Sequence, residues 1–403
     1  ALRDEAWEAF RAAPAPSKTS EAWRRVDFGQ WRLDALTREH LAIRPAGALP
    51  PLELGGAAGV FRQELGSSQV EVALSPEAKA QGVVFCSLEQ ALASHPRLAE
   101  PAMMRCAGED LAKLEAAAAA GFAGGAFLYV PAGAKVERPF DASFIHPAGL
   151  AYGFPRLVVA LGDGAEATVV EDHGGGDAGR RVSAAFGRAR LGKAAKLGYF
   201  YTQTLGAETT HYWSQRVDLA QDAELRHYSI LLGGALHKSD LHVELLGSGA
   251  SSELFGLLFG CRKQVFDART WQMHRAPRSR SNLLFKTALQ DRARSVYTGM
   301  IRVDPEAVGC DAYQQNNNLL LSEAARADTT PVLEILTDQV HCKHGATMGP
   351  VRAEELFYLG TRGLDPREAA RTLVTGFFEP ILRHVPLERL KERLPDDIAR
   401  RIA

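Results

Sequence analysis

The residues best suited to chemistry lie in the segment VHCKHGATMG (340–349), where a cysteine stands between two histidines. The sequence leading into it, LEILTDQ, favours a β-strand, in which successive side chains alternate between two faces. Cys342 and His344 would then share one face, and His341 and Lys343 the other. Thiolate and imidazole groups are ligands for zinc, copper and iron–sulfur species. Two ligands on one face leave a tetrahedral site incomplete, so the others would come from elsewhere in the fold or from another chain.

Two alternative interpretations of this segment involve no metal. A structural cysteine beside a solvated histidine is the simplest alternative to a metal site. A cysteine nucleophile with its base two residues away is unusual, because the two groups normally come from separate elements.

GRARLGKA (187–194) follows the P-loop pattern up to Lys193, but Ala194 stands where a magnesium-ligating Ser or Thr is required. ATP hydrolysis by this chain is therefore not expected.

The histidines outside this segment are dispersed along the chain. They include His173, His211, His227 and His237, and His227 lies in a predicted strand, where a satisfied core or surface histidine is the simplest interpretation. They form no HxxxH or HExxH pattern. The sequence therefore points to no second histidine site.

The composition limits the class of protein. With 403 residues the chain is expected to contain two or three structural units, and its net charge of −1 gives no broad basic surface for nucleic acid. No apolar run is long enough to span a bilayer, and the charged N-terminus does not fit a secretory signal. The cysteines are odd in number and scattered, which favours a reducing cytosol over a disulfide framework. They are Cys86, Cys106, Cys261, Cys310 and Cys342.

The chain divides into three regions by pattern. Residues 1–120 read as mainly helical, 121–348 alternate with period two, and 349–403 are helical again. Within the middle region a turn-then-alanine signal recurs, roughly thirty residues apart, as expected of a β-solenoid whose coils bury their inner faces by stacking. Because the period is not strict, a β-sandwich or jelly roll is the alternative. The signal occurs in GDGAEATV (162–169), LGKAAKLG (191–198), AQDAELRH (220–227), GSGASSEL (247–254), QDRARSVY (290–297) and SEAARADT (322–329).

The C-terminal region carries an apolar helical stripe. Asp365-Pro366 predicts a helix start, with an N-cap followed by proline in the first turn. Apolar residues then recur at i, i+3 and i+4 spacing. Such a stripe is usually intramolecular core, and at a chain end it can also dock a partner. Its candidate docking residues are Leu373, Phe377, Phe378 and Ile381.

Several segments resemble the SufB/SufD family of iron–sulfur cluster assembly proteins. The resemblance is most specific in DAYQQNNNLLLS (311–322), HGAT (344–347) and LFYLGTRG (356–363). SEAWR (20–24) and FLYVPAGAKVERPF (127–140) are similar to N-terminal segments of the family. A Cys-x-His immediately before GAT resembles the SufD branch, whereas GFFEPIL (376–382) is closer to SufB.

The resemblance implies a mainly β protein, a right-handed parallel β-helix flanked by N-terminal and C-terminal α-helical domains. It implies a cytoplasmic, non-catalytic subunit that pairs with a SufB-like paralogue and recruits a SufC-like ABC ATPase through its C-terminal helices. His344, with Cys342, would lie at the partner interface and take part in iron acquisition. Transient iron or a nascent Fe–S cluster shared with the partner would be held there, with no cofactor bound stably.

Three alternatives remain open. A SufB-like scaffold would carry the nascent cluster itself, and an isolated chain could form a homodimer through an exposed solenoid end. A β-helix polysaccharide lyase or hydrolase would need a secreted chain and a cleft with paired carboxylates, and neither is visible in the sequence.

Overall fold

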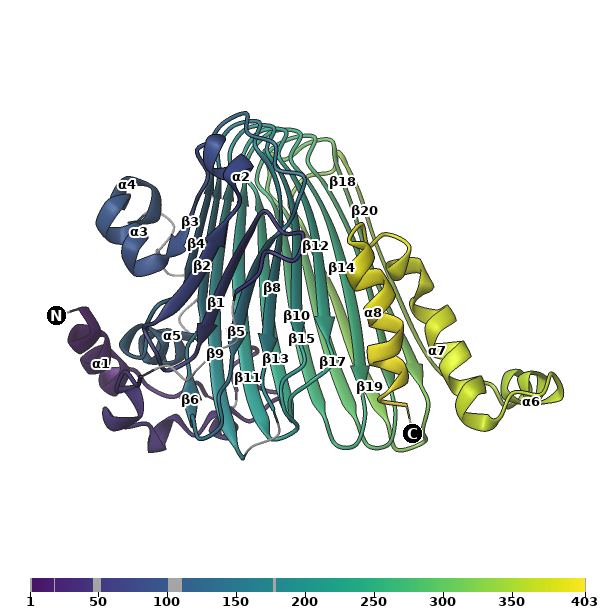
Figure 1. Ribbon diagram of the computed structural model, residues 1–403. Coiled ribbons are helices and arrows are strands. Elements are labelled where there is room, and N and C mark those ends of the chain that lie inside the picture. The colour runs from purple at the N-terminus through teal and green to yellow at the C-terminus, as the bar shows by residue number, and fades with distance from the viewer. Residues whose placement is uncertain (1, 18, 46–51, 101–110, 177–178, 403) are drawn as a thin grey trace.

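A computed structural model describes residues 2–17, 19–45, 52–100, 111–176 and 179–402. Two long sheets face each other and form the walls of a parallel β-solenoid, with helices at both chain ends (Figure 1). Neighbouring strands pair in parallel, apart from β1 with β2 and β3 with β4, which are antiparallel. The predicted solenoid is therefore confirmed, and the sandwich alternative is wrong.

The strands of the first sheet, here sheet A, follow one another in the order of the coils. They are β2 (Val70–Leu74), β1 (Gly59–Glu64), β5 (Phe140–Ile145), β8 (Glu166–Gly174), β10 (Lys196–Gln203), β12 (Glu224–Leu231), β14 (Ser251–Gly260), β16 (Arg280–Leu289), β18 (Cys310–Leu320) and β20 (Val340–Pro350).

Sheet B faces sheet A across the solenoid interior. Its strands are β3 (Val84–Ser87), β4 (Ala126–Val130), β7 (Arg156–Leu161), β9 (Arg181–Leu191), β11 (Thr209–Leu219), β13 (Leu236–Leu245), β15 (Val265–His274), β17 (Arg294–Val303) and β19 (Arg326–Ile335), with β6 (Tyr152–Gly153) beside β9. β1 and β3 lie in the segment predicted to be mainly helical, whereas β2 falls in SSQVEVALS (67–75), whose pattern favours a short strand. Both sheets therefore begin earlier in the chain than residue 121, where the alternating pattern was predicted to start.

The turn-then-alanine signal arises at the solenoid corners. At one corner each coil has a residue with positive φ, and its backbone N–H donates to a carbonyl of the next coil, as Ala194 does to Gln221 at 2.8 Å. From the coil of Gly164 onward the residue that follows is buried, and it must be small because the equivalent positions of successive coils stack directly on each other. These residues are Ala165, Ala195, Ala223, Ala250, Ser279 and Cys310. The motifs at 290–297 and 322–329 lie at another corner, where Ala293 and Ala325 are buried.

Most of the N-terminal region covers the outer face of sheet B, whereas α2 (Pro76–Ala80) packs Ala78 into the inner core of the first coils. The region also contains α1 (Leu2–Ala12), the 3-10 turns η1 (Phe28–Trp31), η2 (Leu33–Ala35) and η3 (Glu39–Leu41), and the helices α3 (Leu88–Ser94), α4 (Pro96–Ala99) and α5 (Ala112–Ala120). Trp23 and Trp31 are buried, with ring centroids 5.2 Å apart, and share a core with Tyr212 of β11. This packing fixes the N-terminal layer to the early coils.

The C-terminal region covers the outer face of sheet A. It comprises α6 (Ala353–Thr361), α7 (Pro366–Leu382) and α8 (Glu388–Ala399). The predicted start of α7 is confirmed, because the Asp365 side chain accepts the Glu368 N–H at 2.8 Å and Glu368 returns a bond to the Asp365 N–H. α7 and α8 pack their apolar faces on Phe200 and Tyr228, whereas α6 projects away from the solenoid (Figure 1).

Among the described residues, no helix combines the length and the apolar character needed to cross a membrane. Cys106 lies outside the described residues, and the other cysteines are free thiols.

Candidate functional site at the open end of the solenoid

The solenoid ends in two edge strands, β19 and β20, each paired on one side only within the described chain. The Val351 N–H, just after β20, donates to the Leu320 oxygen of β18 at 3.0 Å. Because N–H directions alternate along a strand, odd-numbered residues of β20 direct their N–H groups to β18 and even-numbered residues direct theirs to the free edge. Just after β19, the Leu336 N–H donates to the Val303 oxygen of β17 at 3.0 Å, so odd-numbered residues of β19 direct their N–H groups to the free edge.

Two prolines agree with this assignment of the free edge. Pro331 in β19 and Pro350 in β20 both occupy positions whose N–H would point outward, where its loss costs no hydrogen bond inside the chain. The remaining outward N–H and C=O groups are free to pair with a strand from another chain. An open edge of this length is prone to association, which makes it a candidate interface.

Cys342 and His344 face the solenoid interior at this open end. Cys342 is in register with Ala312 and His344 with Gln314, and both partners are buried inward-facing residues of β18. His344 is nonetheless exposed, because β20 is the last strand of its sheet and no further coil covers it. The predicted sharing of one face therefore agrees with the register, and His341 and Lys343 lie on the outer face.

The surroundings of Cys342 are apolar. Its side chain is half-buried against a small cluster that includes Cys310, Leu333 and Ile335. Burial, with the nearby Cys310 and Asp311, raises the pKa of the Cys342 thiol to about 11. The thiol is therefore protonated at neutral pH, and binding a metal through it would release a proton.

Ligand chemistry at the open end is incomplete within one chain. Among the described residues, no group of three or more His, Cys, Asp or Glu side chains is arranged to hold a metal ion. Next to His344, the buried Gln314 Oε1 has no hydrogen-bond partner. The Cys342 thiol and the His344 imidazole lie on the inner face of the last strand of sheet A, so an additional ligand has to approach from outside the described coils.

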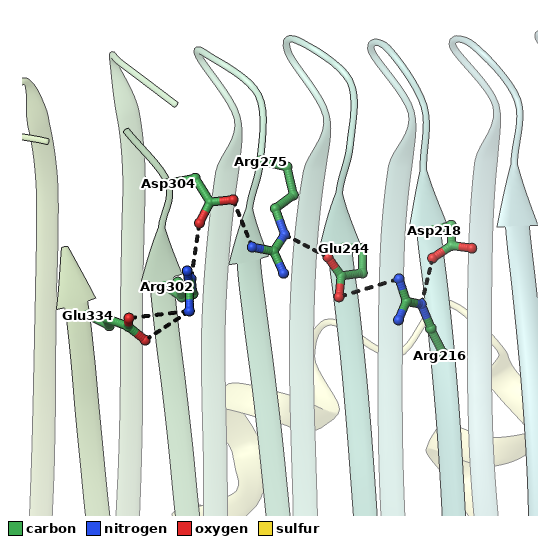
Figure 2. A network of polar contacts seen from close by, with 7 residues as sticks. All are labelled: Arg216, Asp218, Glu244, Arg275, Arg302, Asp304 and Glu334. Atoms are coloured by element: carbon green, nitrogen blue, oxygen red, sulfur yellow. Dashed lines mark hydrogen bonds and ion pairs between the residues drawn. The ribbon is translucent and has the colours of Figure 1, made fainter. Parts of the chain in front are cut away.

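A ladder of ion pairs crosses the outer face of sheet B and stops at the same end (Figure 2). Arg216 lies 3.5 Å from Glu244. Arg275 forms ion pairs with both Glu244, at 3.0 Å, and Asp304, at 2.7 Å. Arg302 then contacts Glu334 of the edge strand β19 at 3.2 Å. The sequence did not reveal this ladder, because its members become neighbours only through the register of successive coils.

A second group of polar side chains was also missed by sequence reasoning. His173 and His211 lie inside the early coils with ring centroids 5.3 Å apart, and His211 lies 5.3 Å from His237. Glu171 accepts hydrogen bonds from the Tyr199 hydroxyl at 2.5 Å and from the Trp213 indole at 3.2 Å. Alternating positions in consecutive strands bring these dispersed residues together, and burial lowers the pKa values of His211 and His237 and keeps both rings neutral.

The residues predicted to dock a partner have different environments. Phe378 and Ile381 are 0% and 2% exposed and pack on sheet A, so their side chains belong to the internal core and are not accessible to another protein. Leu373 and Phe377 are half-buried, and the Phe377 ring lies 4.5 Å from the Lys286 ammonium group. The apolar side chains that this region does expose are on α6. They are Leu356, Phe357 and Tyr358, of which Phe357 is 75% exposed.

Comparisons with known proteins identify relatives of the whole solenoid. A family model described as "SUF system FeS cluster assembly, SufBD core domain" matches residues 144–377. An iron–sulfur cluster assembly SufBD family protein of Mycobacterium tuberculosis is 31% identical over 308 residues, which cover 74% of this chain and 75% of the relative. SufD of Escherichia coli is 32% identical over 60% of this chain and 57% of its own length, and SufD of Bacillus subtilis is 29% identical over 96% and 90%.

Proposed function

This chain belongs to the SufBD family of the SUF iron–sulfur cluster assembly system, and from that premise we propose that it acts as a SufD-like subunit of the assembly complex. In this role it pairs with a SufB-like paralogue through β19 and β20 and binds a SufC-like ABC ATPase through its C-terminal helices. It performs no catalysis alone. The observation that carries the proposal is the uncapped solenoid end, where edge strands and inward-facing ligand atoms coincide.

Pairing at the open end would complete both the sheets and the site. A partner strand beside β20 satisfies its outward backbone groups and covers Cys342 and His344. Iron or a nascent cluster would then be held between thiolate and imidazole from this chain and ligands from the partner. The cluster is cargo of the complex, and the role of this chain is to supply ligands that assist iron acquisition.

The ion-pair ladder places a negatively charged side chain, Glu334, at the proposed interface. Glu334 ends the ladder on the edge strand, and its carboxylate is partnered on one side by Arg302. A strand added next to β19 would place its side chain on the other side of Glu334. We infer that the partner presents a lysine or arginine there, which would favour one register over its neighbours.

The C-terminal helices provide the connection to the ATPase. α7 is fixed to the outer face of sheet A, where Lys286 donates to the Phe377 oxygen at 2.8 Å and Tyr228 donates to the His384 oxygen at 2.5 Å. Movement of ATPase subunits bound at α6 would therefore be transmitted to the sheet that ends in β20. ATP could shift the open end in this way only by favouring one arrangement of the complex over another.

Phe357→Asp is expected to weaken ATPase binding by about tenfold or more, because it removes an aromatic anchor and places a charge on an apolar contact surface. Binding of the purified SUF ATPase is measured by isothermal titration calorimetry. Leu246→Asp is the control, since Leu246 is also an exposed large apolar side chain, 49% exposed, but lies on the solenoid and not on α6. Equal affinities for both variants and the wild type would exclude α6 as the docking element.

The proposed function is tested by co-expressing the tagged chain with the SufB-like paralogue and the SUF ATPase of the same genome. A stable complex that contains all three proteins and accumulates iron and sulfide under anaerobic conditions is expected. A homodimer of this chain that assembles a cluster without the paralogue would instead support the SufB-like scaffold alternative.

A further inference from the structure

A cavity of about 900 Å³ opens at the solenoid corner where the turns meet the ends of α7 and α8. It is formed by turns of successive coils on one side and by the C-terminal helices on the other. Its floor is apolar and includes Leu205, Leu232 and Ile402, all of which are buried. The cavity lies outside the edge strands and outside the surface of α6, so neither the partner interface nor the ATPase contact uses it.

Six of the twenty residues that line the cavity are basic. They are Arg262, Lys263, Arg292, Arg367, Arg400 and Arg401. Asp291 is the one carboxylate among the described lining residues, and its Oδ2 atom already accepts the Arg262 backbone N–H at 2.7 Å. Arg400 pairs with Asp397 outside the cavity. For Arg262, Lys263 and Arg292 there is no ion pair with any described residue.

Backbone contacts hold two of the guanidinium groups in place. Arg367 donates from Nε to the Ile402 oxygen at 3.0 Å, and Arg401 donates from Nε to the Leu232 oxygen at 3.2 Å. Each contact uses one of the five N–H donors of arginine and leaves the terminal nitrogens for another acceptor. Such a fork is suited to bidentate binding of a phosphate.

This concentration of charge needs an explanation, because the chain as a whole carries a net charge of −1. Like charges that converge on a concave surface repel one another, and an anion bound among them removes that repulsion. We propose that the cavity binds a phosphorylated small molecule, with the phosphate among the arginines and its organic part on the apolar floor. A small molecule is favoured over an acidic protein because the basic groups converge into a hollow from several segments.

Cys261 provides an internal reporter of occupancy. Its half-buried thiol lines the cavity and lies 3.5 Å from Gln264 Oε1. Burial raises the pKa of this thiol, and the positive charges of Arg262 and Arg401 oppose that rise. A bound anion would neutralise these charges and cover the sulfur, so alkylation of Cys261 is expected to become several-fold slower.

The test is calorimetric titration of the full chain with sodium pyrophosphate and with ADP at constant ionic strength, and with adenosine as the phosphate-free probe. Alkylation of Cys261 is followed in parallel by peptide mass spectrometry, with buried Cys86 as the internal reference. The variant Lys263→Gln/Arg292→Gln removes two charges from the lining. Arg190→Gln/Lys193→Gln removes two exposed charges elsewhere on the solenoid and controls for general electrostatics.

We expect saturable binding of pyrophosphate or ADP, protection of Cys261, and a dissociation constant raised about tenfold or more by the cavity variant alone. Tighter binding of ADP than of pyrophosphate would support an organic phosphate whose apolar part lies on the floor, whereas equal binding would contradict that part of the proposal and leave the free phosphoanion as the ligand. Absence of saturable binding, or equal weakening in both variants, would overturn the proposal and leave an acidic protein surface as the occupant. None of these outcomes depends on the cluster-assembly role.

Discussion

Ala346→Pro is expected to weaken binding of the SufB-like paralogue by about 10- to 100-fold while this chain remains folded. Ala346 is exposed, and its N–H belongs to the set that points to the free edge of β20. Proline removes that donor and leaves a partner carbonyl unsatisfied, but it breaks no hydrogen bond to β18. The same strand already tolerates Pro350 at an equivalent position. Binding is measured by calorimetry between the two purified chains.

Ala346→Ser is the matched control, because it retains the backbone N–H and changes only the side chain. Circular dichroism and the thermal unfolding midpoint establish that the proline variant keeps its sheets. An unchanged affinity for Ala346→Pro would mean that β20 does not pair with the paralogue. The proposed interface would then have to be abandoned.

Lys238→Met is expected to lower the free energy of unfolding by about 3–5 kcal/mol. Lys238 and Asp267 form an ion pair at 2.7 Å between β13 and β15, with side chains 0% and 3% exposed beneath the N-terminal layer. The Lys238 ammonium group also lies 5.2 Å from the Trp23 ring centroid. Methionine would fill the space but leave Asp267 charged and unpaired in a buried site. Urea unfolding followed by tryptophan fluorescence measures the effect.

Two variants separate this charge effect from loss of packing. Lys238→Met/Asp267→Leu is expected to recover most of the loss, because it removes both buried charges. Lys196→Met breaks the pair between Lys196 and Glu224, whose side chains are 50% and 53% exposed, and should cost about 1 kcal/mol or less. If Lys196→Met and Lys238→Met lowered the free energy of unfolding by similar amounts, burial of the ion pair would not determine its contribution to stability.

The sequence predicted those features that depend on local periodicity. Alternation in β20 was enough to place Cys342 and His344 on one face, and the buried alanines marked the solenoid corners because only small residues stack there. The ordinary helical spacing of α7 also identified its apolar stripe. Which members of the stripe are accessible could not be predicted, because Phe378 is covered by sheet A, a contact between residues far apart in the chain.

Features that depend on the register between coils could not be predicted from the sequence. Glu334 and Arg302 are separated by about one coil, and His211 meets His237 only because β11 and β13 are paired in one register. Similarly, the exposure of His344 follows from its place in the last coil, since Gln314 in the equivalent position of the preceding coil is buried. No local pattern distinguishes these two environments.

The most direct test of the central claim is the iron and sulfide content of the anaerobically purified three-protein complex. Cys342→Ala and His344→Ala are compared with wild type and with Lys343→Ala, whose side chain lies on the opposite face of β20. We predict that both inward-facing variants lose most of their iron and sulfide while the complex stays assembled, and that Lys343→Ala retains both. Unchanged iron and sulfide in Cys342→Ala and His344→Ala would contradict a ligand role and leave the open end as a purely architectural interface.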